Sequence, residues 1–161
     1  MGYITQRPHR AGNCKLEIEL LTIDPGVNKS AVALWSALGT LTFADDIENA
    51  AVFRIIEGVG EARVVVETPV LYPTKRKQHK DVKDLLEIAN RMKAAAFRAL
   101  GVSPAAWKGQ VPKRIHGERI LKALRREEIL AVVSIENHNT IDAIGLGLWV
   151  FGRLGSGGRA C

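Results

Sequence analysis

Three carboxylates occur within or beside apolar segments of the sequence, where an isolated charge is unfavourable. Asp24 ends the apolar run 17–24 directly before a Pro-Gly pair, and Glu67 ends the run 63–67. Asp142 lies near the start of a strongly apolar segment close to the C-terminus. A buried carboxylate without a partner is costly, whereas one divalent cation compensates several carboxylates at once. Oxygen ligands of this type favour Mg²⁺, with Mn²⁺ as a substitute.

The charge balance of the chain indicates what such a metal site acts on. The sequence contains 23 Lys and Arg against 17 Asp and Glu, a net charge of +6. A surplus of this sign favours a polyanionic partner, most simply a nucleic acid, although a soluble protein can also be basic without binding one. Two metal ions a few ångströms apart stabilise both the attacking and the leaving oxygen of a phosphodiester. Carboxylates and charge together predict metal-dependent phosphodiester hydrolysis.

Two residues just before Asp142 are candidates for the same site. On a helix, His138 and Asn139 share the side of Asp142, because they precede it by four and three residues. The imidazole of His138 suits proton transfer to the reacting oxygens or ligation of Mn²⁺. Asn139 either completes an oxygen shell or caps the helix through its side chain. Asp142 also fits the positive end of a helix dipole, and His138 also fits a surface position.

The spacing of apolar residues predicts the elements that position these side chains. We expect strands over residues 17–24, 30–35, 40–44 and 63–67, an extended segment over 102–111, and helices over 47–57, 81–100, 114–127 and 139–151. This order predicts an α/β fold: a mixed five-stranded sheet, its first three strands antiparallel, with helices on both faces. If the first and fourth strands are parallel neighbours, Asp24 and Glu67 lie side by side. Gly145 and Gly147 let the last helix approach the sheet closely, which brings Asp142 near the strand ends.

The chain is long enough for one domain with its own core. We expect residues 1–14 to form a basic flexible leader, residues 15–154 a single domain, and the glycine-rich residues 155–161 a flexible tail. The two cysteines, Cys14 and Cys161, exclude a disulfide framework and a cysteine zinc site. No apolar stretch approaches the roughly 20 residues of a membrane span, so we expect a cytoplasmic protein without membrane attachment.

The segments around the three carboxylates resemble the RuvC-type Holliday junction resolvases, which belong to the ribonuclease H-like superfamily. The matching segments are Leu21–Gly26 (LTIDPG), Val64–Glu67 (VVVE) and Asn139–Gly145 (NTIDAIG), in this order within residues 17–152. The last segment, with His138 before it, looks like the phage-encoded branch of the family. The resemblance implies a ribonuclease H-like fold and a homodimer that nicks four-way DNA junctions symmetrically, with two Mg²⁺ ions per active site.

The same resemblance implies roles for individual residues at the metal site. Asp24, Glu67 and Asp142 match three of the family's four acidic metal ligands. The fourth position, three residues before the last aspartate, holds the uncharged Asn139. His138 is one residue out of register, and some members of the family use histidine at the fourth position. The fourth ligand is therefore open between Asn139 and His138, and we favour His138 as the functional residue.

A basic segment after residue 106 is a candidate phosphate-binding region. By resemblance, Lys108 in the sequence WKGQV and Arg119, eleven positions further on, bind phosphates close to the scissile bond. Lys113 and Arg114 lie between them and are suited to the same role. Ordinary solvated positive charge on a helix is the alternative.

A second basic segment, residues 71–80, follows Glu67 closely and in the resembled fold reaches into the junction. Tyr72 is suited to stacking on a base. The cations of this segment are suited to holding phosphates, and they are Lys75, Arg76, Lys77 and Lys80. The alternative is a solvated charged loop, but its position beside a catalytic strand end favours DNA contact.

Three functions agree with these residues. The first is a junction resolvase. The second is a ribonuclease H-like nuclease that acts on other branched DNA or on RNA–DNA hybrids, for which the metal chemistry is the same. The third is a non-catalytic junction-binding protein, which the uncharged Asn139 makes worth testing.

Overall fold

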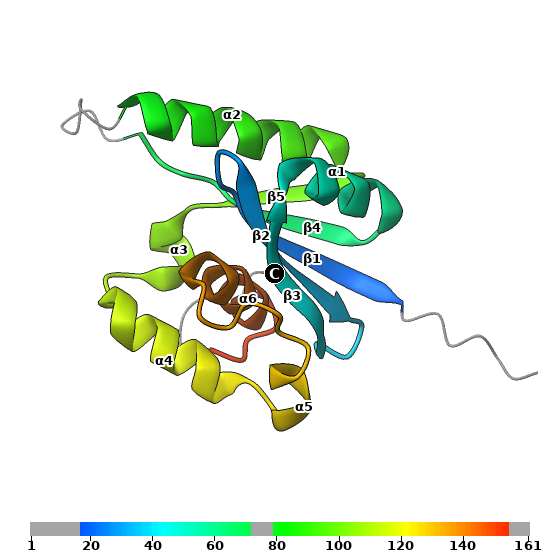
Figure 1. The fold of residues 1–161 in the computed structure, drawn as a ribbon, viewed down its shortest axis with the longest axis vertical. Helices are drawn as coiled ribbons and strands as arrows, with labels where there is room; N and C mark the ends of the chain where they lie inside the picture. Colours follow the sequence, from blue (N-terminus) through cyan, green and yellow to red (C-terminus); the bar gives the residue numbers. More distant parts are fainter. Residues whose placement is uncertain (1–16, 72–78, 155–161) are drawn as a thin grey trace, which may run out of the picture.

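The structure, a computed structural model, describes residues 17–71 and 79–154, and its centre is one five-stranded sheet (Figure 1). The strands are β1 (Ile18–Asp24), β2 (Lys29–Ser36), β3 (Leu41–Glu48), β4 (Arg63–Glu67) and β5 (Arg98–Val102). Their order in the sheet is β3-β2-β1-β4-β5. β1, β2 and β3 pair in antiparallel fashion, whereas β4 is parallel to β1 and β5 is parallel to β4. The predicted mixed sheet, with the first and fourth strands adjacent, is confirmed.

Helices cover both faces of this sheet, as the sequence predicted (Figure 1). One face packs against α1 (Asn49–Gly58) and α2 (His79–Ala95). The other face packs against α6 (His138–Val150), with α4 (Lys113–Ala123) lying on α6. Two short helices, α3 (Pro104–Lys108) and α5 (Arg126–Ile129), complete the second layer. Because the central strands are buried on both faces, they are solidly apolar rather than alternating.

Small residues bring α6 close to the sheet. A Cβ atom on Gly147 would lie 2.2 Å from the Trp35 ring, so only glycine fits there. Gly145, predicted to face the sheet as well, faces the neighbouring helices instead: a Cβ there would lie 2.4 Å from Ile120 on α4 and 2.7 Å from Trp107 on α3. The hydroxyl of Thr22 in β1 donates a hydrogen bond of 2.7 Å to the Ala143 carbonyl. The predicted close approach of α6, on which the position of Asp142 depends, is therefore present.

The segment between α2 and α4 differs from the sequence prediction. The helix expected over 81–100 ends at Ala95, and residues 98–102 form the edge strand β5. The segment expected to be extended, 102–111, contains α3 instead. Leu100 had suggested a continued helical stripe, but it is exposed, and the backbone of its strand pairs with β4. Pro104 begins α3, a position where its missing N–H costs nothing.

Two helix ends also differ from the prediction. The helix expected over 114–127 is divided into α4 and α5, which are separated at Leu124 and Arg125. The cap of α6 is Asn137 rather than Asn139, because the Asn137 side chain accepts a hydrogen bond from the Asn139 backbone N–H at 2.9 Å. Both asparagines satisfy the capping preference, and one hydrogen bond decides between them.

Two predictions about the chain ends cannot be compared with this structure. The expected leader, 1–14, and the expected tail, 155–161, lie outside the described residues. Among the helices of residues 17–71 and 79–154, none has the length and apolar character needed to cross a membrane.

Candidate active site

The ends of β1 and β4 place two of the predicted carboxylates at one edge of the sheet. The two strands pair from Leu20 with Arg63 to Ile23 with Val66, and the same offset aligns Asp24 with Glu67. Glu67 is buried and Asp24 is partly buried. Parallel pairing at the centre of a sheet thus collects charge where the strands end, which is the usual place for a ligand in such folds.

The third carboxylate, Asp142, comes to the same edge from α6, and Lys108 joins it to Glu67. The Lys108 ammonium lies 2.8 Å from Oδ2 of Asp142 and 2.9 Å from Oε2 of Glu67. All three side chains are mostly shielded from solvent. One positive charge therefore lies between two of the predicted metal ligands and compensates both.

Trp107 fixes the other side of Glu67. Its indole N–H donates a hydrogen bond of 2.9 Å to Oε2 of Glu67. The same ring lies under the Lys108 ammonium, 4.9 Å from the ring centroid, at a distance suited to a cation–π interaction. α3 therefore supplies two neighbouring residues that hold Glu67 in place.

The pKa values at the site reflect this concentration of charge. Burial raises the pKa of Asp24 well above 3.8, and the negative charges of Glu67 and Asp142 raise it further against the opposing effect of Lys108. Burial lowers the pKa of Lys108, but Glu67 and Asp142 outweigh it and the net direction is upward, so the ammonium keeps its proton. Three carboxylates close enough to affect one another favour any added positive charge.

The turn after Asp24 is held by polar side chains that sequence reasoning missed. Asn49, the first residue of α1, donates hydrogen bonds to the carbonyls of Gly26 at 3.0 Å and Val27 at 2.9 Å. Its side-chain oxygen accepts a bond of 2.6 Å from the Ser30 hydroxyl, which in turn accepts from the Gly26 N–H. These bonds fix the backbone directly after Asp24. The Pro-Gly pair predicts a turn, but nothing in the sequence pointed to Asn49.

The two candidates for a fourth ligand are exposed at the start of α6. Among the described residues, the side chains of His138 and Asn139 make no hydrogen bond or ion pair. Within residues 17–71 and 79–154, no three His, Cys, Asp or Glu side chains form a group that could hold a metal ion. The structure thus brings Asp24, Glu67 and Asp142 to one sheet edge, two of them paired with Lys108, and leaves the side chains of His138 and Asn139 in solvent.

The predicted DNA-binding residues on α4 are all exposed. The positive charge of Lys113 opposes the rise in the pKa of Asp24. Arg114 forms an ion pair of 2.7 Å with Glu118, and Arg119 donates a hydrogen bond of 3.3 Å to the Leu154 carbonyl. α4 therefore presents positive charge next to the carboxylates.

The second predicted basic segment lies largely outside the described residues, because Tyr72, Lys75, Arg76 and Lys77 fall within 72–78. Lys80 is described and is exposed. It belongs to the first turn of α2 rather than to a loop.

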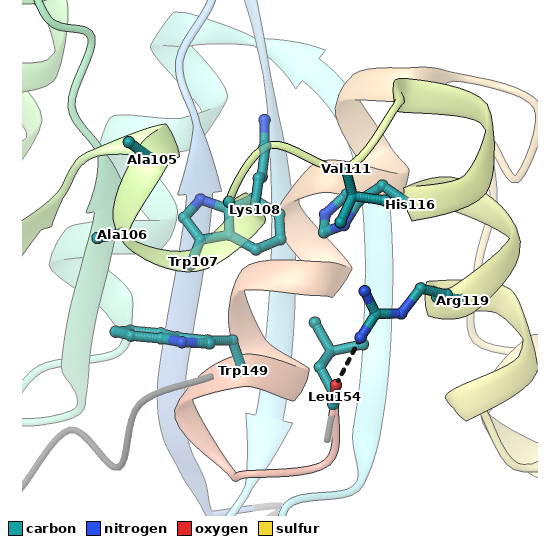
Figure 2. Close-up of a pocket in the computed structure, with 10 residues that line it drawn as sticks. Ala105, Ala106, Trp107, Lys108, Val111, His116, Arg119, Trp149 and Leu154 are labelled. Atoms are coloured by element: carbon teal, nitrogen blue, oxygen red, sulfur yellow. Dashed lines mark hydrogen bonds between the residues drawn. The ribbon is translucent and has the colours of Figure 1, made fainter. Parts of the chain in front are cut away.

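An open cleft of about 480 Å³ adjoins Asp142. It is lined by α3, the segment after it and α4, including Lys108, Lys113 and His116, and Asp142 is at its edge. A second hollow of about 200 Å³ adjoins it on the side of Trp149 (Figure 2). Asp142 is thus reached from a cleft whose other described ionisable side chains are basic or imidazole.

Of the comparisons with known proteins, the one with solved structures identifies the fold. No protein-family model matches the sequence, and no curated protein does. Two solved structures are similar: Thermus thermophilus RuvC in complex with a Holliday junction substrate, and T. thermophilus RuvC itself. Each is 16% identical to this chain, and the TM-scores are 0.53 and 0.51, respectively. Both matches cover 86% of this chain, and they cover 96% and 97% of the respective RuvC chains. This chain therefore shares the fold of these two structures over 86% of its length.

Proposed function

We propose that this protein is a metal-dependent endodeoxyribonuclease that resolves four-way DNA junctions by paired symmetric nicks. The observation that carries the proposal is the meeting of Asp24, Glu67 and Asp142 at one sheet edge, with the Lys108 ammonium bound between two of them. The fold of a junction-binding resolvase and the basic cleft beside the carboxylates support it.

The carboxylates suit Mg²⁺ or Mn²⁺ by their chemistry, since hard oxygen donors are what these ions prefer. Glu67 and Asp142 already bind a monovalent cation, the Lys108 ammonium, so a divalent ion would compete for their oxygens with twice the charge. We assign Asp24, Glu67 and Asp142 as ligands, with Asn139 or His138 as the fourth. Two bound metal ions would supply an activated water and charge stabilisation at the phosphorus.

The chain's own residues would do the remaining work. Trp107 holds the Glu67 carboxylate by its N–H, and Lys113 and Arg119 bind the phosphates that flank the cut. Lys108, once released by the carboxylates, neutralises charge on the scissile phosphate. His138 transfers a proton at the attacking water or the leaving oxygen.

The proposal extends to the assembly and the setting. Symmetric nicking needs two active sites related by a two-fold axis, so we propose a homodimer. The motif around His138 and Asn139 supports a phage-encoded resolvase acting in the cytoplasm of a bacterial host.

A substrate panel tests this function. End-labelled four-way junction, flap, linear duplex and RNA–DNA hybrid are incubated with the protein, with and without Mg²⁺, and the products are separated on a denaturing gel. We expect paired nicks at symmetric positions in opposing strands of the four-way junction, only with metal. Preferential cleavage of the flap or the hybrid would instead make this a nuclease of another specificity.

One observation favours a second candidate, a junction-binding protein without nuclease activity. Lys108 neutralises Glu67 and Asp142, and no group of three such side chains that could hold a metal ion occurs in the described part of the chain. Tight junction binding without cleavage in either Mg²⁺ or Mn²⁺ would establish this candidate and overturn the first.

A further inference from the structure

A hollow of about 200 Å³ adjoins the cleft beside Asp142 and shares Lys108 with its lining. Trp107 and Trp149 form aromatic walls, and His116 and Arg119 face it from α4 (Figure 2). Leu154 borders it at the end of the described chain, where its carbonyl accepts the hydrogen bond from Arg119. The hollow is therefore mainly aromatic and apolar, with cationic groups at its rim.

One buried polar atom in this wall has no partner within the described residues. His116 is only 5% exposed, and its Nε2 makes no hydrogen bond. The ring packs on Trp107 with centroids 5.0 Å apart, which fixes its orientation. A buried polar group without a hydrogen bond costs roughly 1–3 kcal/mol, so a water molecule or a ligand that reaches this atom would be favourable.

The hollow is continuous in its lining with the cleft beside the carboxylates. Lys108, Val111 and His116 line both. A DNA strand whose phosphate lies at Asp142 therefore has a neighbouring nucleotide within reach of the hollow. An additional phosphate is a poor fit among aromatic walls, whereas a flat base with polar edges matches both the walls and the Nε2 atom.

We propose that this hollow receives one unpaired base of the cleaved strand, next to the scissile phosphate, and that it contributes to the choice of cleavage sequence. The base stacks on Trp149 or Trp107, and Arg119 holds its backbone phosphate. His116 Nε2, which is closed to solvent in this structure, bonds to the polar edge of the base after a small shift of the lining. The inference rests on the proposed nuclease function, since it takes the carboxylates as the place of the cut. Bases at a branch point are the easiest to unstack, which agrees with a branched substrate.

Photo-crosslinking tests the position of the base without depending on cleavage. Four-way junctions carry one 5-iodouracil each, at successive positions around the cut site, and are bound to the protein in Ca²⁺ and irradiated. We expect one position, or two adjacent ones, to give a crosslink that mass spectrometry maps to Trp107, Trp149 or His116. Crosslinks confined to other residues, in a complex that binds and cuts normally, would overturn the pocket and leave the proposed function intact.

Kinetics with an abasic nucleotide test its contribution. Removing the base at the crosslinked position should slow wild-type cleavage about tenfold, the effect expected of one lost stacking contact. Trp149→Leu should slow cleavage of the intact junction by a similar factor, but should slow cleavage of the abasic junction much less. Trp149→Phe keeps an aromatic ring and should cut the intact junction at close to the wild-type rate. His116→Phe keeps the ring against Trp107 and should flatten the preference among the four bases at that position.

Phe97→Leu serves as the matched control, because Phe97 is an exposed aromatic before β5 and not in the lining of the hollow. It should leave all these values unchanged. Equal slowing of intact and abasic substrates by Trp149→Leu would show a structural effect only and would overturn the inference. Failure of the wild type to bind a junction would overturn both this inference and the proposed function. Junction cleavage without a crosslink in the hollow would overturn this inference alone.

Discussion

At the scale of single residues, Lys108 has the most consequential position. Its ammonium forms ion pairs with both Glu67 and Asp142 at 2.9 and 2.8 Å, in surroundings that solvent reaches poorly. Such a cation stabilises two adjacent carboxylates in the absence of metal. It also competes with a metal ion for the same oxygens, and the strength of this competition can be measured.

We predict that Lys108→Met raises the affinity for Mn²⁺ about tenfold, a difference of about 1.4 kcal/mol, because a competing positive charge is removed. Junction cleavage should fall in the same variant, since the scissile phosphate loses a cation. Titration calorimetry with Mn²⁺ measures the affinity. Lys122→Met is the control, because Lys122 is an exposed lysine of α4 that does not line the cleft and has no ion pair among the described residues. Equal Mn²⁺ affinities in wild type and Lys108→Met would show that Lys108 does not share the metal ligands.

The three carboxylates could be predicted from the sequence, whereas the residues that hold them could not. Asp24 and Glu67 each end an apolar run, and a carboxylate in such a position is recognisable from the sequence alone. Lys108 was predicted as a phosphate contact, but its ion pairs with carboxylates depend on how α3 packs. The Trp107 hydrogen bond joins residues 40 positions apart, so only the folded chain reveals it.

At the scale of elements, α6 decides whether Asp142 reaches the site. Its glycines allow contact with Trp35 on β2 and with Trp107 on α3. Its first turn is capped by Asn137, which also donates a hydrogen bond of 2.9 Å to Asp46 on β3. The sheet therefore contacts α6 both along the helix, at Gly147, and at its N-terminal cap, Asn137.

Gly147→Ala should lower the free energy of unfolding by about 1–3 kcal/mol, because the added methyl group would lie 2.2 Å from the Trp35 ring and must displace it. Urea denaturation measures the change. Gly58→Ala is the control: it lies in α1 with nothing within 4 Å of the added atom, and it should be neutral or slightly stabilising. A Gly147→Ala variant as stable as the wild type would contradict the close packing of α6.

Asn137→Ala should lower the free energy of unfolding by about 1 kcal/mol through loss of the cap. Asn139→Ala, two residues away, should change it by less than about 0.5 kcal/mol, as expected of an exposed side chain. Thermal unfolding of the two variants compares them directly. A larger loss for Asn139→Ala would place the cap where the sequence alone suggested it.

The elements that sequence reasoning placed correctly are the strongly apolar ones. β1, β4 and α6 are buried, and their composition reflects this. β5 was missed because it is an edge strand whose first four residues are exposed, so backbone pairing with β4 rather than side-chain pattern defines it. The boundary between α4 and α5 was missed for a similar reason, since both flanking segments contain charged residues suited to a helix.

At the scale of the whole molecule, a buried ion pair joins the segment after α6 to α5 in the second layer. Glu128 is fully buried, and Arg153 contacts both of its oxygens at 2.7 Å. The backbone N–H groups of Leu41 and Arg125 donate to the same carboxylate. Residues from β3, α5 and the segment after α6 thus meet at one charge.

This ion pair predicts how stability depends on pH. Burial raises the pKa of Glu128, but the bonds from Arg153, Arg125 and Leu41 outweigh it and lower the pKa from its ordinary 4.5 to about 2. The native state therefore binds the proton more weakly than the unfolded state does. This stabilisation is complete above pH 4.5 and is lost as the pH falls toward 2.

Glu128→Gln should lower the free energy of unfolding at pH 7 by about 3–5 kcal/mol, because Arg153 loses its buried partner. Below pH 4.5 the difference between variant and wild type should narrow. Urea denaturation at a series of pH values measures both. A difference that stays constant down to pH 3 would show that Glu128 does not titrate in this way.

The central claim is that Asp24, Glu67 and Asp142 bind the metal ions that cut a DNA junction. Single-turnover cleavage of a four-way junction by wild type and Asp24→Asn, over a range of Mg²⁺ concentrations, tests it most directly when junction affinity is measured in parallel. We predict metal-dependent cleavage that Asp24→Asn slows at least about a hundredfold, or about 2.7 kcal/mol, with junction binding retained. Cleavage by Asp24→Asn at a near-normal rate would contradict the account.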